Sequence, residues 1–176
     1  MTHLTKKILF MMATSVLQSH AQNGTAIATS RTFKRTTCVS INILASKEII
    51  WALLTNADDF PRWNSTIVSM HGEIKEGGKV ELKSTLDPKR TFKLKVKGFE
   101  PESKMTWTDG MAPFFKGKRT YLLSSADDGS VNFTMEETMS GLMFPLAAKS
   151  IPDFRESFEQ YAADLKKEAE IISTLK

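Results

Sequence analysis

The feature that most restricts the fold is a long amphipathic pattern at the C-terminal end of the chain. From Ile151 to Ile172, apolar residues recur at spacings of three and four, which is the period of one buried helix face. Pro152 and Asp153 suit the first turn of a helix, and Lys166 and Lys167 suit its later turns, because they complement the helix dipole. A single helix of this length needs an apolar surface to pack against.

The region that precedes this helix predicts a strand, two short helices and then a set of strands. Phe33–Leu44 alternates apolar and polar residues, as a strand with one buried face does. Ser46 is an N-cap candidate for a short helix that ends near Asn56, and Pro61 suits the start of a second, very short helix.

From about Thr66 to Met139 the apolar period is that of strands, so we expect an antiparallel meander. Phe92, Leu94 and Val96 alternate with lysines, which predicts an apolar inner face and a solvated outer face. Turn residues separate the expected strands at Gly77-Gly78, Asp87-Pro88, Pro101-Glu102-Ser103 and Asp127-Asp128-Gly129.

These elements predict one α+β domain in which a curved antiparallel sheet wraps around the C-terminal helix. A chain of 176 residues with 41% hydrophobic residues is long enough to bury one core. A bent sheet covered on one face by a single helix does not close fully at both ends, so we expect a cavity between them.

Four segments resemble the helix-grip superfamily, often called SRPBCC, which includes START-like lipid-transfer domains, the birch-pollen-allergen fold and polyketide cyclase/dehydrase-like proteins. They are ASKEIIWALLTNADDFPRWNS, EGGKVEL, GFEPESKMTWT and IPDFRESFEQYAADLKKEAE. The resemblance covers about Arg31 to Ile171. It implies a seven-stranded sheet that grips the last helix around a ligand cavity, and it implies no particular reaction.

The N-terminal segment is typical of a secretory signal peptide. Lys6 and Lys7 precede an apolar run, and small residues follow up to Ala21. We expect cleavage after residue 21, a flexible lead-in over 22–30 and the helix-grip domain over 31–176, in a secreted or periplasmic protein. The alternative is a cytoplasmic protein whose translation starts at Met11 or Met12.

Charge and residue usage argue against several kinds of function. The formal net charge of +4 includes two lysines of the signal segment, and the other basic residues are scattered among acidic ones, so a nucleic-acid partner is not favoured. After cleavage, His71 and Cys38 would be the last His and Cys, which leaves too few ligands for a zinc site. No nucleotide-binding glycine motif is present. We expect no metal and no cofactor.

Polar residues on the apolar faces of strands are the candidates for chemistry. Glu137 shares its face with Phe133, Met135 and Met139, and a carboxylate buried there would serve as an acid or base or bind a ligand hydroxyl. Asp109 follows Trp107 on one face, although the glycine after it also fits a turn. The expected ligand-binding residues are Trp107, Asp109, Tyr121, Phe133, Met135, Glu137, Met139, Phe154 and Phe158. Arg35 and Tyr121 would meet a carboxylate only if the strand register allows it.

The sequence favours a binding or carrier domain for a hydrophobic small molecule, lipid-like or polyketide-like. One alternative is a cyclase- or dehydratase-like enzyme with Glu137 as its acid/base group. Another is a protein-interaction module that uses the lysine-bearing outer face, including Lys93 and Lys95. The apolar connection Leu142–Leu146 fits a lid over the cavity better than a membrane contact, and no stable membrane insertion is expected once the signal is removed. Neither the ligand nor the oligomeric state follows from the sequence.

Overall fold

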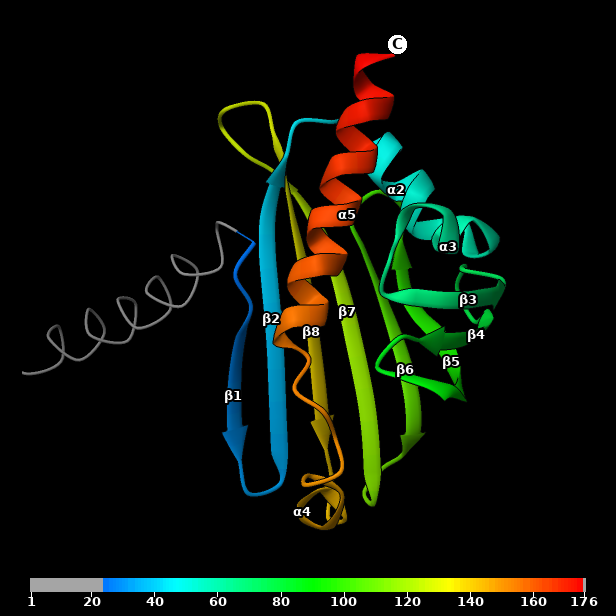
Figure 1. The fold of residues 1–176 in the computed structure, drawn as a ribbon, viewed down its shortest axis with the longest axis vertical. Helices are drawn as coiled ribbons and strands as arrows, with labels where there is room; N and C mark the ends of the chain where they lie inside the picture. The colour runs from blue at the N-terminus through cyan, green and yellow to red at the C-terminus, as the bar shows by residue number, and fades with distance from the viewer. Residues whose placement is uncertain (1–23, 176) are drawn as a thin grey trace, which may run out of the picture.

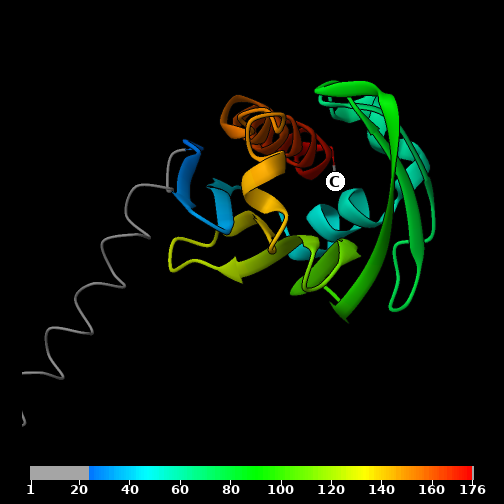
Figure 2. The ribbon, with the colours of Figure 1, turned by 90° about the horizontal axis from the view of Figure 1, so that it is seen from below.

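The structure is a computed structural model that describes residues 24–175. An antiparallel sheet curves around a long C-terminal helix, and two short helices follow the first long strand, as the sequence predicted (Figure 1). Figure 2, along the long axis, shows the sheet bending around this helix. The predicted signal peptide, residues 1–21, lies outside the described residues.

The strands run in the order β1-β2-β8-β7-β6-β5-β4-β3 across the sheet. Their bounds are β1 Ile27–Arg31, β2 Lys34–Ile43, β3 Ile67–Gly72, β4 Lys79–Ser84, β5 Asp87–Glu100, β6 Lys104–Met111, β7 Phe115–Ser125 and β8 Val131–Ser140. The helices are α2 Lys47–Thr55, the 3-10 turn η1 Ala57–Asp59, α3 Phe60–Trp63, α4 Phe144–Ala147 and α5 Arg155–Thr174.

The eighth strand, β1, corrects the expectation of seven strands and of a flexible lead-in over 22–30. Residues 27–31 pair with β2 along their whole length. Just before them, the backbone N–H of Gly24 donates to the carbonyl oxygen of Ser40, and that of Ala26 donates to the Glu159 carboxylate on α5. Small polar residues therefore form an edge strand here because β2 and α5 supply hydrogen-bond partners.

The meander from β3 to β8 has the predicted inner and outer faces. Val96 is buried, Phe92 and Leu94 are partly buried, and the three lysines that alternate with them are exposed. The later strands present Met105, Trp107, Phe133 and Met135 to the interior. This alternation gives the sheet one continuous apolar face against α5.

Helix α5 packs its apolar stripe into the concave face of the sheet. Its buried residues are Phe158, Tyr161, Ala162, Leu165 and Ala169. The two alanines leave room for a close approach of the helix to β2, with which it makes its most extensive contact. The short helices α2 and α3 bury their own apolar residues beside the C-terminal half of α5 (Figure 1).

The helix begins at Arg155 rather than at Ile151, which corrects its predicted start. Pro152 disfavours helical backbone in the residue before it. The Asp153 carboxylate accepts a hydrogen bond from the backbone N–H of Arg155. In addition, the Arg35 guanidinium donates to the carbonyl oxygens of Ile151 and Pro152 at 3.1 and 3.3 Å. Residues 151–154 are thereby held as a non-helical approach to α5.

Gly141 allows β8 to pass close to the turn between β6 and β7. Its φ is +136°, and a Cβ at this position would collide with the carbonyl oxygen of Phe114. The chain then enters α4, where Leu142 and Met143 donate backbone hydrogen bonds to the carbonyl oxygens of Pro113 and Phe114 at 2.9 Å each. The glycine thus fixes where α4 lies relative to the sheet.

Gly141→Ala should lower the free energy of unfolding by about 2 kcal/mol or more, because the new methyl group adds a steric clash to an unfavourable φ. Gly98→Ala is the matched control, since Gly98 also has a positive φ, of 55°, but a Cβ there meets no atom within 4 Å. Denaturant unfolding of both variants measures the difference. Equal losses of stability would contradict the close approach at Gly141.

Candidate functional site

A cavity lies between the concave face of the sheet and the N-terminal end of α5. Its volume is about 180 Å³. Residues of β4 to β8 form one wall, and Ser150 to Phe158 form the opposite one. The exposed lining residues Leu86, Arg90, Ser150 and Pro152 mark where it meets solvent. The cavity is therefore open on the side between the β4–β5 turn and the segment that leads into α5.

Most of the side chains that line the cavity are apolar. They are Ile67, Leu82, Leu86, Phe92, Leu94, Trp107, Phe115, Met135, Met139, Ile151, Pro152, Phe154, Phe158 and Tyr161. Seven of the nine predicted ligand-binding residues are in the lining: Trp107, Asp109, Met135, Glu137, Met139, Phe154 and Phe158. Tyr121 and Phe133 are fully buried in the core and do not line it.

The main polar feature of the wall is an ion pair between Arg119 and Glu137. These residues face each other across β7 and β8. Arg119 Nε donates to Glu137 Oε2 at 2.7 Å, and its Nη2 donates to the same oxygen. Only 20% and 15% of the two side chains is exposed, and the ring of Phe158 lies 5.1 Å from the guanidinium carbon. Glu137 is therefore the partner of a buried cation, not the isolated acid that the sequence suggested.

This pair also determines the charge state of Arg119. Burial would lower the pKa of the guanidinium, but the negative charge of Glu137 and the interaction with Tyr121 outweigh burial and raise it. Removing one member of a mostly buried pair leaves the other uncompensated, which costs about 3–5 kcal/mol in other proteins. The two residues are best regarded as one neutral, strongly polar unit in an apolar wall.

Asp109 adds a second carboxylate beside the ion pair. It lies on β6 opposite Gly117, whose missing side chain leaves the space that the carboxylate occupies, since a Cβ there would collide with Asp109 Oδ1. Burial raises the pKa of Asp109 above its ordinary value of 3.8, and the charge of Glu137 raises it further. Arg90, a backbone hydrogen bond with Gly117, and Arg119 oppose this shift. Asp109 and the glycine after it both belong to β6, so the turn position suggested by that glycine is wrong, and Asp109 lines the cavity.

Tyr161 lines the cavity and packs on a group of aromatic rings in the core. Tyr161 of α5 lies 5.9 Å from Trp63, 6.2 Å from Tyr121 and 6.3 Å from Phe133, between ring centroids. Burial raises the pKa of Tyr161 well above 10.0, so its hydroxyl stays protonated. Within residues 24–175, the buried Trp107 Nε1 meets no hydrogen-bond partner. Trp107 is itself a lining residue.

Other polar residues that the sequence singled out lie away from the cavity. Arg35 holds the segment before α5 through backbone carbonyl oxygens of Ala148, Ile151 and Pro152. His71 is exposed and pairs with Asp58 at 2.8 Å. Burial, together with the charge of Glu136, raises the pKa of Cys38 to about 11, which keeps the thiol protonated. Residues Leu142–Leu146 do not line the cavity, so the predicted lid is wrong.

Arg119 is the residue that sequence reasoning missed, although a signal for it existed. It precedes Tyr121 by two residues, and the period of a strand places both on the inner face. A basic residue two positions from an inward tyrosine is therefore inward as well. Arg90 and Tyr161 are two further lining residues that the sequence did not indicate, although Tyr161 falls within the periodic apolar pattern of the C-terminal helix.

Comparisons with known proteins agree with this architecture. A family model described as "Polyketide cyclase / dehydrase and lipid transport" matches residues 34–170. A search of curated proteins found no match.

Several solved structures share the fold at low sequence identity. A hypothetical protein of Helicobacter pylori superposes with a TM-score of 0.60 at 14% identity, covering 76% of this chain and 86% of its own. A START superfamily protein of Mycobacterium smegmatis gives 0.58 at 15% identity, covering 78% and 98%. The di-domain ARO/CYC StfQ of the steffimycin biosynthetic pathway gives 0.60 at 7% identity, covering 89% of this chain and 55% of that one. These likenesses show the fold.

The raised pKa of Asp109 predicts how stability depends on pH. Folding favours the protonated carboxyl, so this residue makes the protein less stable as the pH rises from below 3.8 through the raised value. Asp109→Asn removes that titration. The free energy of unfolding of the variant, relative to the unmodified chain, should therefore increase with pH over this range and then level off. Denaturant unfolding at a series of pH values measures it.

Asp128→Asn is a control with the opposite sign. Hydrogen bonds from the side chain and backbone of Ser130 lower the pKa of Asp128, so its contribution to stability is present at neutral pH and is lost as the pH falls. A difference for Asp109→Asn that shrinks with rising pH would show that Asp109 is not desolvated.

Proposed function

This chain belongs to the polyketide cyclase / dehydrase and lipid transport family, and we propose that it binds and carries an apolar small molecule that bears one polar group. The observation that carries this proposal is the cavity itself, in which mostly apolar walls surround the Arg119–Glu137 pair and Asp109. An apolar pocket with a few convergent polar groups is the usual form of a small-molecule site.

The walls suit the apolar part of such a ligand. Phe92, Leu94, Ile151 and Phe154 belong to β5 and to the approach to α5, and they face the same space. The volume of about 180 Å³ is below the range of about 300–1,000 Å³ typical of larger ligands. A small ring system or a short alkyl chain is the size that fits, and a longer ligand would extend through the open side.

The polar residues suit a hydroxyl or carbonyl group on that ligand. Arg119 is a donor, whereas Glu137 and Asp109 are acceptors, or in the case of protonated Asp109 a donor. Trp107 lines the same cavity and has an unpartnered Nε1, which would gain from a polar partner because a buried polar group without one is unfavourable. A plain hydrocarbon would leave all of these groups unused.

Carriage is favoured over catalysis by the state of Glu137. Its carboxylate is engaged by two donors of one guanidinium, so proton transfer would first have to disrupt the ion pair. A charge that is already compensated is better suited to orienting a ligand than to reacting with it.

Leu94→Trp should fill part of the cavity and weaken binding of a dansyl-labelled fatty acid by about tenfold or more, the equivalent of about 1.4 kcal/mol. Leu94 lines the cavity from β5. The fluorescence of the probe, titrated with the full chain, gives the Kd. A competing apolar ligand that carries a hydroxyl group should displace the probe better than an alkane of the same length.

Leu122→Trp is the matched control for this substitution. Leu122 lies on the outer face of β7 with 41% of its surface exposed, and it does not line the cavity. This variant should bind the probe as the unmodified chain does. Unchanged binding by Leu94→Trp, or equal losses in both variants, would refute binding in the cavity.

A second candidate function, a dehydratase- or cyclase-like reaction, is favoured by one observation, the raised pKa of Asp109. A raised pKa moves a carboxyl group toward the range in which it can donate a proton to a departing hydroxyl group. If Glu137 took a proton from the neighbouring carbon, water would leave and a double bond would form. Asp109 is therefore a better acid candidate than Glu137.

Conversion of the ligand distinguishes the two candidates. A small molecule extracted from the purified protein is returned to fresh protein, and mass spectrometry follows its mass with time. The carrier proposal predicts an unchanged mass. Loss of water, abolished in Asp109→Asn while that variant still binds the dansyl probe, would instead establish the enzyme.

A further inference from the structure

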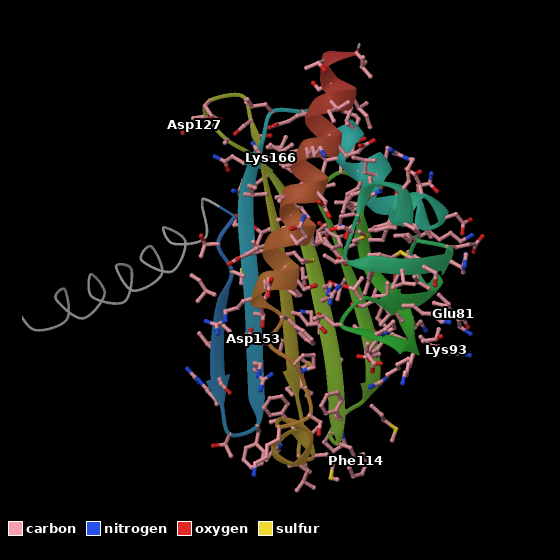
Figure 3. All side chains as sticks on the ribbon, in the orientation of Figure 1. Glu81, Lys93, Phe114, Asp127, Asp153 and Lys166 are labelled. Atoms are coloured by element: carbon pink, nitrogen blue, oxygen red, sulfur yellow. The ribbon has the colours of Figure 1, made fainter. Side chains whose placement is uncertain are left out.

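Large apolar side chains are exposed together at the end of the molecule that carries α4. Phe33, Met111, Phe114, Leu142, Met143 and Leu146 are 46–74% exposed. Phe33 and Phe114 lie in the β1–β2 and β6–β7 turns, and Met111 ends β6. Leu142 and Met143 connect β8 to α4, and Leu146 lies in α4. Figure 3 labels Phe114 at this end, opposite the C-terminus in Figure 1. We call these six residues the apolar tip.

Backbone hydrogen bonds join the chain segments that form the apolar tip, so its side chains are held in fixed positions relative to one another. Gly141 donates to the carbonyl oxygen of Phe33 at 3.1 Å, Leu142 to that of Pro113 and Met143 to that of Phe114. Phe144 anchors α4 to the rest of the protein. Its side chain is 1% exposed, and the guanidinium carbon of Arg35 lies 5.9 Å from the centroid of its ring. The exposed neighbours of Phe144 are therefore held outward by a packed base.

Positive charges flank the apolar tip. Arg31, Lys34, Lys116 and Lys149 are exposed beside it, and Ser140, at the end of β8, pairs with Lys34 on one side and Lys116 on the other. The segments 31–35, 110–118 and 138–152 contain no Asp or Glu, although the chain has 20 of these residues. Apolar side chains flanked by cations complement a surface that is apolar inside and anionic outside.

Part of the cavity lining is continuous in the chain with this end. Phe115 and Ser150 line the cavity and directly follow Phe114 and Lys149. Within residues 24–175 no helix is long and apolar enough to cross a membrane.

We propose that the apolar tip docks this protein on an anionic lipid surface, with Leu142, Met143 and Leu146 entering the headgroup region and the lysines contacting lipid phosphates. The inference goes beyond ligand binding in the cavity, for which the tip residues are not needed. Docking would bring the lining residues Phe115 and Ser150 near the bilayer, where an apolar ligand is dissolved. A second copy of the chain fits less well, because a symmetric contact through this end would bring the two sets of cations together.

Co-sedimentation with vesicles tests the proposal on the full chain. The protein should bind vesicles of equal parts phosphatidylcholine and phosphatidylglycerol, and bind phosphatidylcholine alone more weakly. Leu142→Ser combined with Leu146→Ser should weaken binding by about tenfold or more. Lys34→Glu combined with Lys116→Glu should remove the preference for anionic vesicles. All four side chains are exposed, so thermal unfolding should be unchanged.

Leu44→Ser combined with Leu175→Ser is the control, since these leucines are 66% and 81% exposed at the opposite end. It should bind vesicles as the unmodified chain does. Residues 1–23 are the same in every protein compared, so any membrane affinity of that segment cancels. Equal binding by the tip variant and the control would overturn the proposal. So would a dimer that the tip substitutions dissociate without any vesicle binding. Dansyl fatty acid binding, measured in parallel, reports separately on the cavity.

Discussion

The packing of Tyr161 into the concave face of the sheet is the interaction on which the rest of the structure depends. Its ring lies among aromatic side chains from α3, β7 and β8, and with Leu165 and two alanines it holds the C-terminal part of α5 against the strands. Losing a buried aromatic ring of this kind costs about 3–5 kcal/mol. No other residue of α5 contacts so many rings of the core.

The cavity begins where the packing of Tyr161 against the sheet ends. Tyr161 lines the cavity, and beyond this residue Phe158 and Phe154 stack on each other with centroids 6.0 Å apart. Arg35 holds the preceding segment through backbone carbonyls, so the chain does not collapse onto the sheet there. Strand register then places Trp107, Arg119 and Glu137 in one row across the sheet. The Arg119–Glu137 ion pair thus faces a space that α5 does not fill.

Periodicity in the sequence was enough to predict the architecture, but it could not predict the register between paired strands. Alternation placed Phe133, Met135 and Glu137 on one inner face because a strand has a period of two. Nothing local indicates that Arg119 lies opposite Glu137, because that contact depends on the register of β7 and β8. The edge strand β1 was missed for a similar reason: its small polar residues form a strand only when β2 and Glu159 complete its hydrogen bonds.

Native mass spectrometry of the full chain purified from its own cells tests the central claim most directly. Binding of an apolar molecule with a polar group predicts a non-covalent adduct that is released when the protein is denatured. Its elemental composition should be rich in carbon and hydrogen with a few oxygens. Spectra that contain only the unliganded chain, from protein that also fails to bind the dansyl fatty acid, would contradict the account.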